Sequence, residues 1–464
     1  MSKLHKTISP LIIISGIFAL LITAGFGCKG MTTAEKQLTQ PIKLEYWTIF
    51  DDVDALRANI NNYKISRPYL TVNVRQLSAD EFYPRLIEAL AEDKGPDIIS
   101  IRNRWLKEYE SKLAPMPATA GDTLVTVTKT QLGTNTTVTP VSRSLPTIGQ
   151  LDSEYVKAVK QDVVLNNKIY GLPLSLDTLA VYYNKDLLDR AGIAQPPKNW
   201  VEFQADVKKI TKYDSRTGQV TQAGAALGSG KNVAGVDDIL QVIFAQSKVP
   251  FVNANGQAVF AGGNGKDQSA ATNLVNFYTD FANPSRDTYT WNNQMGASLD
   301  EFVSGKVGFL IGYSYHHSLI KARAPQLNFG VLPLFQLDPD NPVNAANYWV
   351  SAVTAKSKNQ NAAWSLIDYL THSKATKDYL DATGRPSALR VYLSAQKENS
   401  ALLPFVSQVL VAQSWYHGRN YDVALKAVSD MVDSWIILPQ KAVGVNDYRQ
   451  NLLNQTAAKI NQTL

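Results

Sequence analysis

Residues 170–200 read YGLPLSLDTLAVYYNKDLLDRAGIAQPPKNW, a close succession of strand, turn and helix signals. Leucine occupies every second position over 172–176, as in a half-buried strand whose successive side chains face opposite ways. Pro173 predicts that this strand lies at an edge or a crossing point, because proline has no N–H for a sheet ladder. Residues 179–183 predict a second strand, and a short helix follows that Gly192 ends. The stretch therefore predicts a segment that leaves one sheet and enters another, as a hinge requires.

On the amino-terminal side of this stretch, predicted strands alternate with predicted helices. Strand patterns occur in IKLEYWTIF, TVNVRQL and GPDIISI, which begin at residues 42, 71 and 95. Apolar residues at helical spacing follow the first strand, with Asp51 or Asp52 placed to cap that helix. This alternation predicts an α/β domain with a largely parallel sheet. With 464 residues and 45% hydrophobic content, the chain is long enough for two such domains.

Three local patterns predict further structure. Residues 123–146 are rich in Thr and Val and alternate in TLVTVTKTQL, which indicates either an inserted β excursion or a surface loop. Asn255 and Gly256 lie between short apolar runs and predict a hairpin. Ser298 and Glu301 have the spacing of a capping box at a helix start. None of these patterns indicates chemistry by itself.

Residues 1–27 have the pattern of a secretory signal peptide. A basic start precedes an apolar run over residues 11–22, which is short for a membrane span; a single N-terminal anchor helix is the alternative. Cys28 is the only cysteine, so no intrachain disulfide can form. Residues 28–41 are expected to be a tether, polar and without pattern from Thr32 onward. The formal net charge is +6, but no basic run or RNA-binding motif accompanies it, and nucleic acid is not an expected partner.

The chain resembles the family 1 extracellular solute-binding proteins, which are the sugar receptors of ABC importers. The resemblance is specific at GPDI, at residues 170–188, at GKVGFLI and in the helix around Trp364. It implies a periplasmic-binding-protein-like fold, in which two α/β lobes are joined by a hinge of three crossings. Cys28 also resembles the lipidated cysteine of bacterial lipoproteins, which implies a lipid anchor.

The family pattern also implies how the chain is divided between the lobes. The crossings are expected in residues 170–200, in GKVGFLIG with the loop and helix after it, and in NYWVSAVTAK. The N-terminal lobe is then formed by residues 42–173 plus 309–350, and the C-terminal lobe by residues 174–308 plus 351–464. Closure of two such lobes around a ligand is the expected motion.

A sugar presents C–H faces and a rim of hydroxyls, so its receptor needs flat aromatic rings together with carboxylates, amides and guanidinium groups. Ligands of open α/β sheets bind at the carboxyl ends of strands. The candidate ligand-binding residues are residues of these types that stand at predicted strand ends or at positions that the resemblance assigns to the ligand. They are Trp47, Asp51, Asp52, Arg102, Asn103, Trp105, Asp177, Tyr313, Tyr315, Trp349, Trp415, Tyr416 and Arg419.

The resemblance places an acidic ligand contact at Asp177, and SWYHGR resembles the segment that supplies an aromatic plate and an arginine from the second lobe. Trp415 is the first candidate there. Each candidate has a structural alternative: core packing for the rings, helix capping for Asp51 and Asp52, a solvated charge cluster for residues 102–105, and a hydrogen bond to the hinge backbone for Asp177.

Signatures of catalysis are incomplete. GYSYH, which ends at His316, lacks the second glycine of a nucleophile elbow, and GAALGSGKN departs from the phosphate-binding loop. The adjacent His316 and His317 have no nearby cysteine or carboxylate pair, so no metal site, cofactor or catalytic residue is expected. A glycoside hydrolase is the remaining enzyme alternative, because that chemistry needs only two separated carboxylates and leaves no short motif.

We therefore expect a monomeric, extracytoplasmic, lipid-anchored receptor that closes on a sugar or oligosaccharide and presents it to the permease subunits of an ABC transporter. The alternative keeps the fold and changes the ligand to a peptide, a polyamine, phosphate or ferric ion. Ferric ion would use tyrosine pairs such as Tyr182 with Tyr183. Tryptophans at the candidate loops favour sugar.

Overall fold

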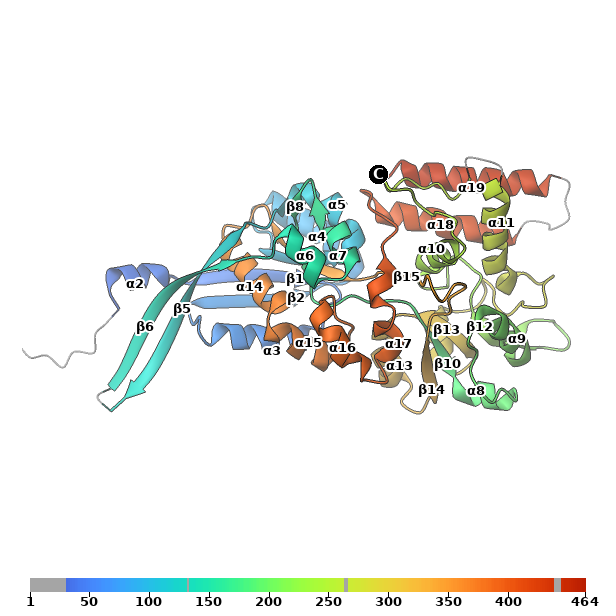
Figure 1. Cartoon of the computed structure of the whole chain (residues 1–464), viewed down its shortest axis with the longest axis horizontal. Helices are drawn as coiled ribbons and strands as arrows, with labels where there is room; N and C mark the ends of the chain where they lie inside the picture. The colour runs from blue at the N-terminus through green and yellow to red at the C-terminus, as the bar shows by residue number, and fades with distance from the viewer. Residues whose placement is uncertain (1–30, 132, 263–265, 438–443) are drawn as a thin grey trace, which may run out of the picture.

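Two α/β lobes lie side by side in the computed structural model of the chain (Figure 1). The structure describes residues 31–131, 133–262, 266–437 and 444–464. The predicted signal peptide and Cys28 lie outside the described residues. Within those ranges, no helix combines the length and the apolar character that a membrane crossing needs.

The first lobe is built on a mixed sheet with the strand order β2–β1–β3–β16–β4, in which β9 also pairs with β16. Strands β2, β1 and β3 run parallel, and β16 is antiparallel to β3. This agrees with the largely parallel sheet expected from the alternating pattern. The strands are β1 (Ile42–Thr48), β2 (Leu70–Gln76), β3 (Ile98–Arg102), β4 (Leu113–Ala114), β9 (Leu172–Pro173) and β16 (Trp349–Thr354).

Helices cover this sheet and bury one face of each against it. In α3 (Val53–Lys64), Leu56, Ile60 and Tyr63 are buried at a spacing of three to four residues. Asp52 begins the helix by accepting a hydrogen bond from the Ala55 N–H, 2.9 Å away, which confirms one of the two predicted caps. The other elements are α4 (Ala79–Ala91), η1 (Asn103–Trp105), α5 (Leu106–Tyr109), η2 (Glu110–Lys112), α6 (Ile148–Glu154), α7 (Lys157–Val163), β7 (Val164–Leu165), β8 (Lys168–Ile169), α14 (Gln360–His372), α15 (Lys374–Thr383) and α16 (Arg390–Lys397).

The Thr-rich insertion is a β-hairpin, as one of the two sequence-based readings predicted. Strands β5 (Thr119–Thr130) and β6 (Gly133–Ser144) pair antiparallel over their whole length and extend away from the sheet (Figure 1). The short helix α2 (Thr33–Leu38) lies against β6 and begins with a capping box between Thr32 and Glu35. The expectation of a patternless tether was therefore wrong for these residues, because the capping pair stabilises a helical turn.

The second lobe is built on a sheet with the order β11–β12–β13–β10–β14. Its strands are β10 (Ala180–Asn184), β11 (Lys212–Tyr213), β12 (Val220–Ala226), β13 (Val307–Gly312) and β14 (Phe329–Pro333). Its helices are α8 (Lys185–Arg190), α9 (Trp200–Ile210), α10 (Val236–Gln246), α11 (Lys266–Thr279), η3 (Asp280–Ala282), α12 (Ser298–Val303), α13 (Ser314–Arg323), α18 (Tyr421–Ile436) and α19 (Val445–Asn461). Each lobe has its own hydrophobic core.

The division between the lobes differs from the one expected from sequence. Residues 309–350 were assigned to the first lobe, but β13 pairs with both β10 and β12, and β14 pairs with β10, so both strands belong to the second sheet. Residues 351–397 were assigned to the second lobe, but most of β16 and all of α14 to α16 pack on the first core. An apolar pattern predicts that a strand forms, but it does not predict which strand it pairs with, because pairing is set by residues far along the chain.

Three crossing segments connect the lobes: residues 174–179, 344–348 and 408–414. The first lies inside the predicted stretch 170–200, and the second precedes β16 at the predicted third crossing. The crossing expected after β13 does not exist, since α13 stays in the second lobe. Instead the third segment returns from the first lobe through α17 (Leu403–Val406), η4 (Val409–Val411) and β17 (Ala412–Gln413), which pairs with β15 (Asn344–Ala345).

Two other local predictions had opposite outcomes. The hairpin at Asn255 and Gly256 is confirmed by a 2.9 Å hydrogen bond from the Asn253 N–H to the Gln257 carbonyl and by a φ of +78° at Gly256. The capping box at Ser298 was wrong. Helix α12 begins at Ser298 itself, whose hydroxyl accepts a hydrogen bond from the Ala234 N–H instead, at 3.2 Å.

Candidate ligand-binding site

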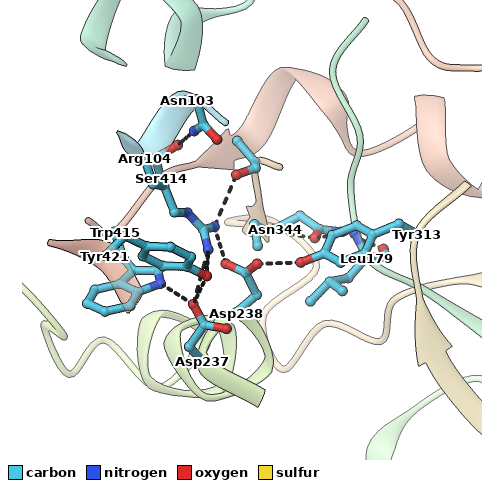
Figure 2. A network of polar contacts seen from close by, with 12 residues as sticks. Asn103, Arg104, Leu179, Asp237, Asp238, Tyr313, Asn344, Ser414, Trp415 and Tyr421 are labelled. Carbon is cyan, nitrogen blue, oxygen red and sulfur yellow. Dashed lines mark hydrogen bonds and ion pairs between the residues drawn. The ribbon is translucent and has the colours of Figure 1, made fainter. Parts of the chain in front are cut away.

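The side chain of Asn344 joins all three crossing segments. This fully buried amide sits in the second segment, accepts a hydrogen bond from the Leu179 N–H at 3.0 Å, and donates to the Leu179 carbonyl at 2.8 Å. It also donates to the Gln408 side chain at 2.6 Å (Figure 2 shows the Leu179 end). Asp177 and Asn347 exchange two 3.0 Å backbone hydrogen bonds in the same region. The three crossings are therefore held together as one unit.

Arg104 carries a buried ion network from the first lobe to the second. It lies in η1, directly after β3, and pairs with Asp237 at 3.1 Å and with Asp238, both at the start of α10 (Figure 2). Tyr421 and Trp415 donate to Asp237 at 2.8 and 3.0 Å. Burial alone would lower the pKa of Arg104, but Asp238 and its neighbours outweigh it and raise that pKa well above its usual value. The guanidinium is therefore charged and fixed between the lobes.

A second polar cluster surrounds Asp162 of α7. Its carboxylate accepts hydrogen bonds from the side chains of Asn103 at 2.8 Å, Tyr348 at 2.6 Å and Ser414 at 2.7 Å, and it contacts the His417 ring at 2.8 Å. Burial raises the pKa of Asp162, but the contact with His417 and the hydroxyl donors lower it by more than burial raises it. The net pKa therefore lies below the usual value. This cluster links the first lobe to the second and third crossing segments.

Asp177, at the predicted acidic ligand contact, is held by the amino-terminal end of α13. Its carboxylate accepts from the Ser314 N–H at 3.0 Å, the Ser314 hydroxyl at 2.7 Å and the Thr178 N–H at 2.9 Å. Burial raises its pKa to about 6, and the donors only partly offset this. The carboxylate is thus satisfied by the protein alone.

Four aromatic rings meet where the lobes face each other; we call them the boundary rings: Phe50, Trp105, Tyr315 and Trp349. All four are half-buried. Phe50 of the first lobe contacts Tyr315 of the second edge to face, with ring centroids 4.8 Å apart, and stacks on Trp349 at 5.5 Å. Trp349 also meets Trp105 at 5.7 Å. The boundary rings form a partly exposed apolar surface to which both lobes contribute.

Two guanidinium groups border the boundary rings. Arg102 ends β3 as the register partner of Trp349, and its guanidinium carbon lies 6.0 Å from that ring and 5.5 Å from the ring of Tyr421. Arg385 lies 4.4 Å from the Phe50 ring and donates to the Phe50 carbonyl at 3.2 Å. Flat cations beside flat rings match the faces and edges of a saccharide.

Beside the boundary rings, a pocket of about 730 Å³ opens at the carboxyl ends of β1 and β2. Phe50, Asp51, Asp52 and Arg385 line it together with residues of α3 and β2. The carboxyl ends of parallel strands are where open α/β sheets bind ligands. Asp51 itself is buried and its pKa is raised by that burial, whereas Asp52 is exposed and caps α3.

The predicted site residues fall into three groups. Asp51, Asp52, Arg102, Trp105, Tyr315 and Trp349 come together at the pocket and the boundary rings. Asn103, Asp177 and Tyr313 are buried in the polar networks at the lobe boundary. Trp47, Tyr416 and Arg419 lie elsewhere, and Trp415 reaches the lobe boundary only through its hydrogen bond to Asp237.

The remaining aromatic candidates are packed in cores. Trp47 is 7% exposed in the first core, and Trp415 is 1% exposed in the second, where it meets the Phe251 ring at 5.3 Å. Tyr416 is equally buried and its hydroxyl bonds to Thr463. These rings leave a ligand no face in this conformation, so the choice of Trp415 as the first stacking candidate was wrong. Arg419 is exposed and lines a separate pocket of about 740 Å³.

Several residues at the boundary were missed in the sequence. Phe50 and Arg385 become neighbours only through the fold, and they are 335 residues apart in the chain. The pair Asp237 and Asp238 at a helix start was a visible signal, but acids there ordinarily stabilise the helix end. Asn344 gave no signal, because its role depends on two other segments.

The fold and this interlobe site define a two-lobed receptor of the solute-binding class, and comparisons with known proteins agree. The model of the bacterial extracellular solute-binding protein family matches residues 51–377, and the chain belongs to that family. A putative binding protein of Brucella abortus (strain 2308) is 23% identical over 321 residues, which cover 66% of each chain, about two thirds of that protein's length. A galactooligosaccharide-binding protein of Bacillus subtilis (strain 168) is 22% identical over 308 residues, covering 66% of this chain and 69% of that one.

Solved structures share the fold at low sequence identity. A cyclo/maltodextrin-binding protein complexed with maltotetraose superposes with a TM-score of 0.66 at 15% identity, covering 91% of this chain and 97% of that one. An ABC transporter solute-binding protein of Thermotoga lettingae bound with α-D-tagatose gives 0.65 at 18% identity, covering 91% and 99%. These likenesses confirm the periplasmic-binding-protein-like architecture expected from the sequence.

Proposed function

We propose that this protein is the extracytoplasmic substrate-binding component of an ABC importer, which captures a sugar or oligosaccharide between its lobes and delivers it to a permease. The observation that supports this most is the set of boundary rings, because both lobes contribute rings to one partly exposed surface bordered by Arg102 and Arg385. Relatives whose names record galactooligosaccharide and maltodextrin binding point to the same class of ligand.

The mechanism follows from the hinge and the boundary rings. A ligand that contacts both lobes binds the closed form more tightly than the open form, and it shifts the equilibrium toward closure. The crossing segments, held together by Asn344, are the fixed point of that motion. Stacking on Trp349 and Tyr315 supplies affinity, and the bordering guanidinium groups orient hydroxyls. The protein acts by binding, and no side chain is assigned a catalytic role.

Location and anchoring belong to the same proposal. Residues 1–27 direct export, Cys28 is lipidated, and the protein stays on the outer face of the membrane as a monomer beside its permease. The membership of an extracellular solute-binding family supports the extracytoplasmic location. Metabolic labelling with a radioactive fatty acid tests the anchor: the wild type should carry label and a Cys28→Ser variant should not.

A thermal-shift screen with mono- and oligosaccharides tests the binding function. A ligand that binds only the folded state raises the melting temperature, and the shift grows with the logarithm of its concentration over its Kd. Trp349→Ala should reduce the shift, whereas Trp364→Phe, a conservative change in the first core, should change baseline stability but not the shift. A flat response to every saccharide, with a response to peptides, polyamines or phosphate, would replace sugar by one of those ligands.

A further inference from the structure

Arg102 differs from its neighbour Arg104 in having no acidic partner. Arg104 is paired with both Asp237 and Asp238. Arg102 forms no ion pair with any residue that the structure describes, and its surroundings are the rings of Tyr421, Tyr315 and Tyr313 together with Arg104 itself. A guanidinium that is partly removed from water without a counter-charge is a costly arrangement in a folded protein.

The atoms of Arg102 indicate which part of the side chain is open. Nε is buried and has no hydrogen-bond acceptor among the described residues. The residue as a whole is half-buried, and its two outer nitrogens form no hydrogen bond with any residue that the structure describes. The head of the side chain therefore presents free N–H donors next to Trp349, its partner in the β3–β16 register.

The nearby carboxylates are committed to other groups. The Asp177 carboxylate accepts hydrogen bonds from Ser314 and Thr178, and Asp51 accepts one from the Thr48 hydroxyl at 2.9 Å. Burial weakens the ionisation of both, since it raises their pKa values. Arg385 is the cation whose charge acts on these two acids. Neither of these carboxylates forms an ion pair with the Arg102 guanidinium.

From this geometry we propose that Arg102 is a specificity-determining residue and that the ligand is an acidic saccharide, whose uronate carboxylate pairs with the Arg102 guanidinium while its ring stacks on Trp349. The fork of N–H groups in arginine matches a carboxylate bidentately. An unpaired arginine beside an aromatic platform thereby gains the counter-charge that the protein does not provide. This inference rests on the proposed function, because it names the class of sugar.

Matched disaccharides test the inference by calorimetric titration of the full chain. Each pair differs only in whether C6 is a carboxylate or a hydroxymethyl group, as in digalacturonate against galactobiose and glucuronosyl-glucose against cellobiose. The acidic member of at least one pair should bind at least roughly tenfold more tightly, as expected for charge-assisted hydrogen bonds. Its affinity should also fall as salt is raised, because the pairing is electrostatic.

Variants assign the preference to one side chain. Arg102→Gln should remove the advantage of the acidic saccharide, and Arg102→Lys should restore it only in part, since a lysine cannot form the bidentate pair. Arg323→Gln is the matched control, an exposed arginine on α13 that pairs with Asp300 away from the boundary rings. It should leave both affinities unchanged.

The outcomes separate this inference from the proposed function. Equal or tighter binding of the neutral members overturns the acidic-saccharide inference and leaves a sugar receptor. An acidic preference that survives Arg102→Gln overturns the role of Arg102. Failure of every saccharide, acidic and neutral, overturns the inference together with the proposed function.

Discussion

Arg104 of the first lobe and Asp237 of the second form an ion pair 3.1 Å long, with side chains only 1% and 2% exposed. The pair lies beside the second crossing segment, where Arg104 also donates to the Ala346 carbonyl at 3.2 Å. A buried charge pair in this position sets the relation between the lobes near the hinge. Its removal on one side leaves the other charge without a partner in a dry environment.

Arg104→Ala should therefore destabilise the protein by about 3–5 kcal/mol, because Asp237 and Asp238 would remain buried without their cation. Urea denaturation monitored by circular dichroism measures this change. Arg57→Ala, which removes an exposed arginine of α3, is the control and should lie within about 0.5 kcal/mol of wild type. An Arg104→Ala variant as stable as that control would contradict a structural role for the network.

Asn344→Leu should loosen the hinge. The substitution keeps the approximate volume but leaves the Leu179 N–H and carbonyl without their side-chain partner, which costs about 1–3 kcal/mol for each buried group left unsatisfied. Hydrogen exchange should show faster exchange of the Leu179 amide in the variant. Unchanged exchange at that amide would show that the side chain does not hold the crossings together.

Trp415→Ala should act through stability and not through ligand contact. The ring is buried in the second core, and its loss leaves a cavity, for which large aromatic truncations cost about 3–5 kcal/mol. Thermal unfolding with and without ligand separates the two effects. A variant with a normal melting temperature but no ligand-induced shift would place Trp415 in the site after all.

His372 predicts a pH dependence of stability within the first lobe. Its Nε2 contacts Glu154 and its Nδ1 lies 3.6 Å from Asp368. Asp368 and Glu154 outweigh partial burial and raise the pKa of His372 to about 9 from the usual 6.5. When the folded state raises the pKa of a group, its protonated form stabilises the folded state. That stabilisation is complete below the unfolded-state pKa and is lost as pH rises through the folded-state pKa. The charged His372 ring therefore contributes its full stabilisation below about pH 6.5, and this contribution disappears as the pH rises through about 9.

His372→Gln tests this by urea denaturation across pH. The free energy of unfolding of the variant should fall below that of the wild type at pH 6, and the difference should shrink as pH is raised past 9. Partial solvent exposure of the ring will moderate the size of the effect. A difference that stays constant from pH 6 to pH 10 would contradict the charged contact.

Local features of this fold could be predicted from sequence, and non-local ones could not. The Asp52 cap, the hairpin at Gly256 and the strand pattern of the 123–146 insertion depend on a few adjacent residues, and the structure contains all three. The lobe to which β13 belongs depends on pairing with β10, more than a hundred residues earlier in the chain. Local pattern carries no information about that choice.

The same limit applies to the candidate site. Trp349 and Trp415 look alike in sequence, since each stands beside a tyrosine and each is a candidate ring for the ligand. Trp349 ends at the lobe boundary because it begins β16 opposite Arg102, whereas Trp415 is covered by Phe251 and Tyr421. Which ring remains accessible is decided by packing between distant segments.

The most direct test is a crystal structure with the saccharide that gives the largest thermal shift. We expect a sugar ring stacked on Trp349, in contact with Tyr315 of the other lobe and within hydrogen-bond reach of Arg102. A saccharide bound away from the boundary rings, or held by one lobe alone, would contradict this expectation.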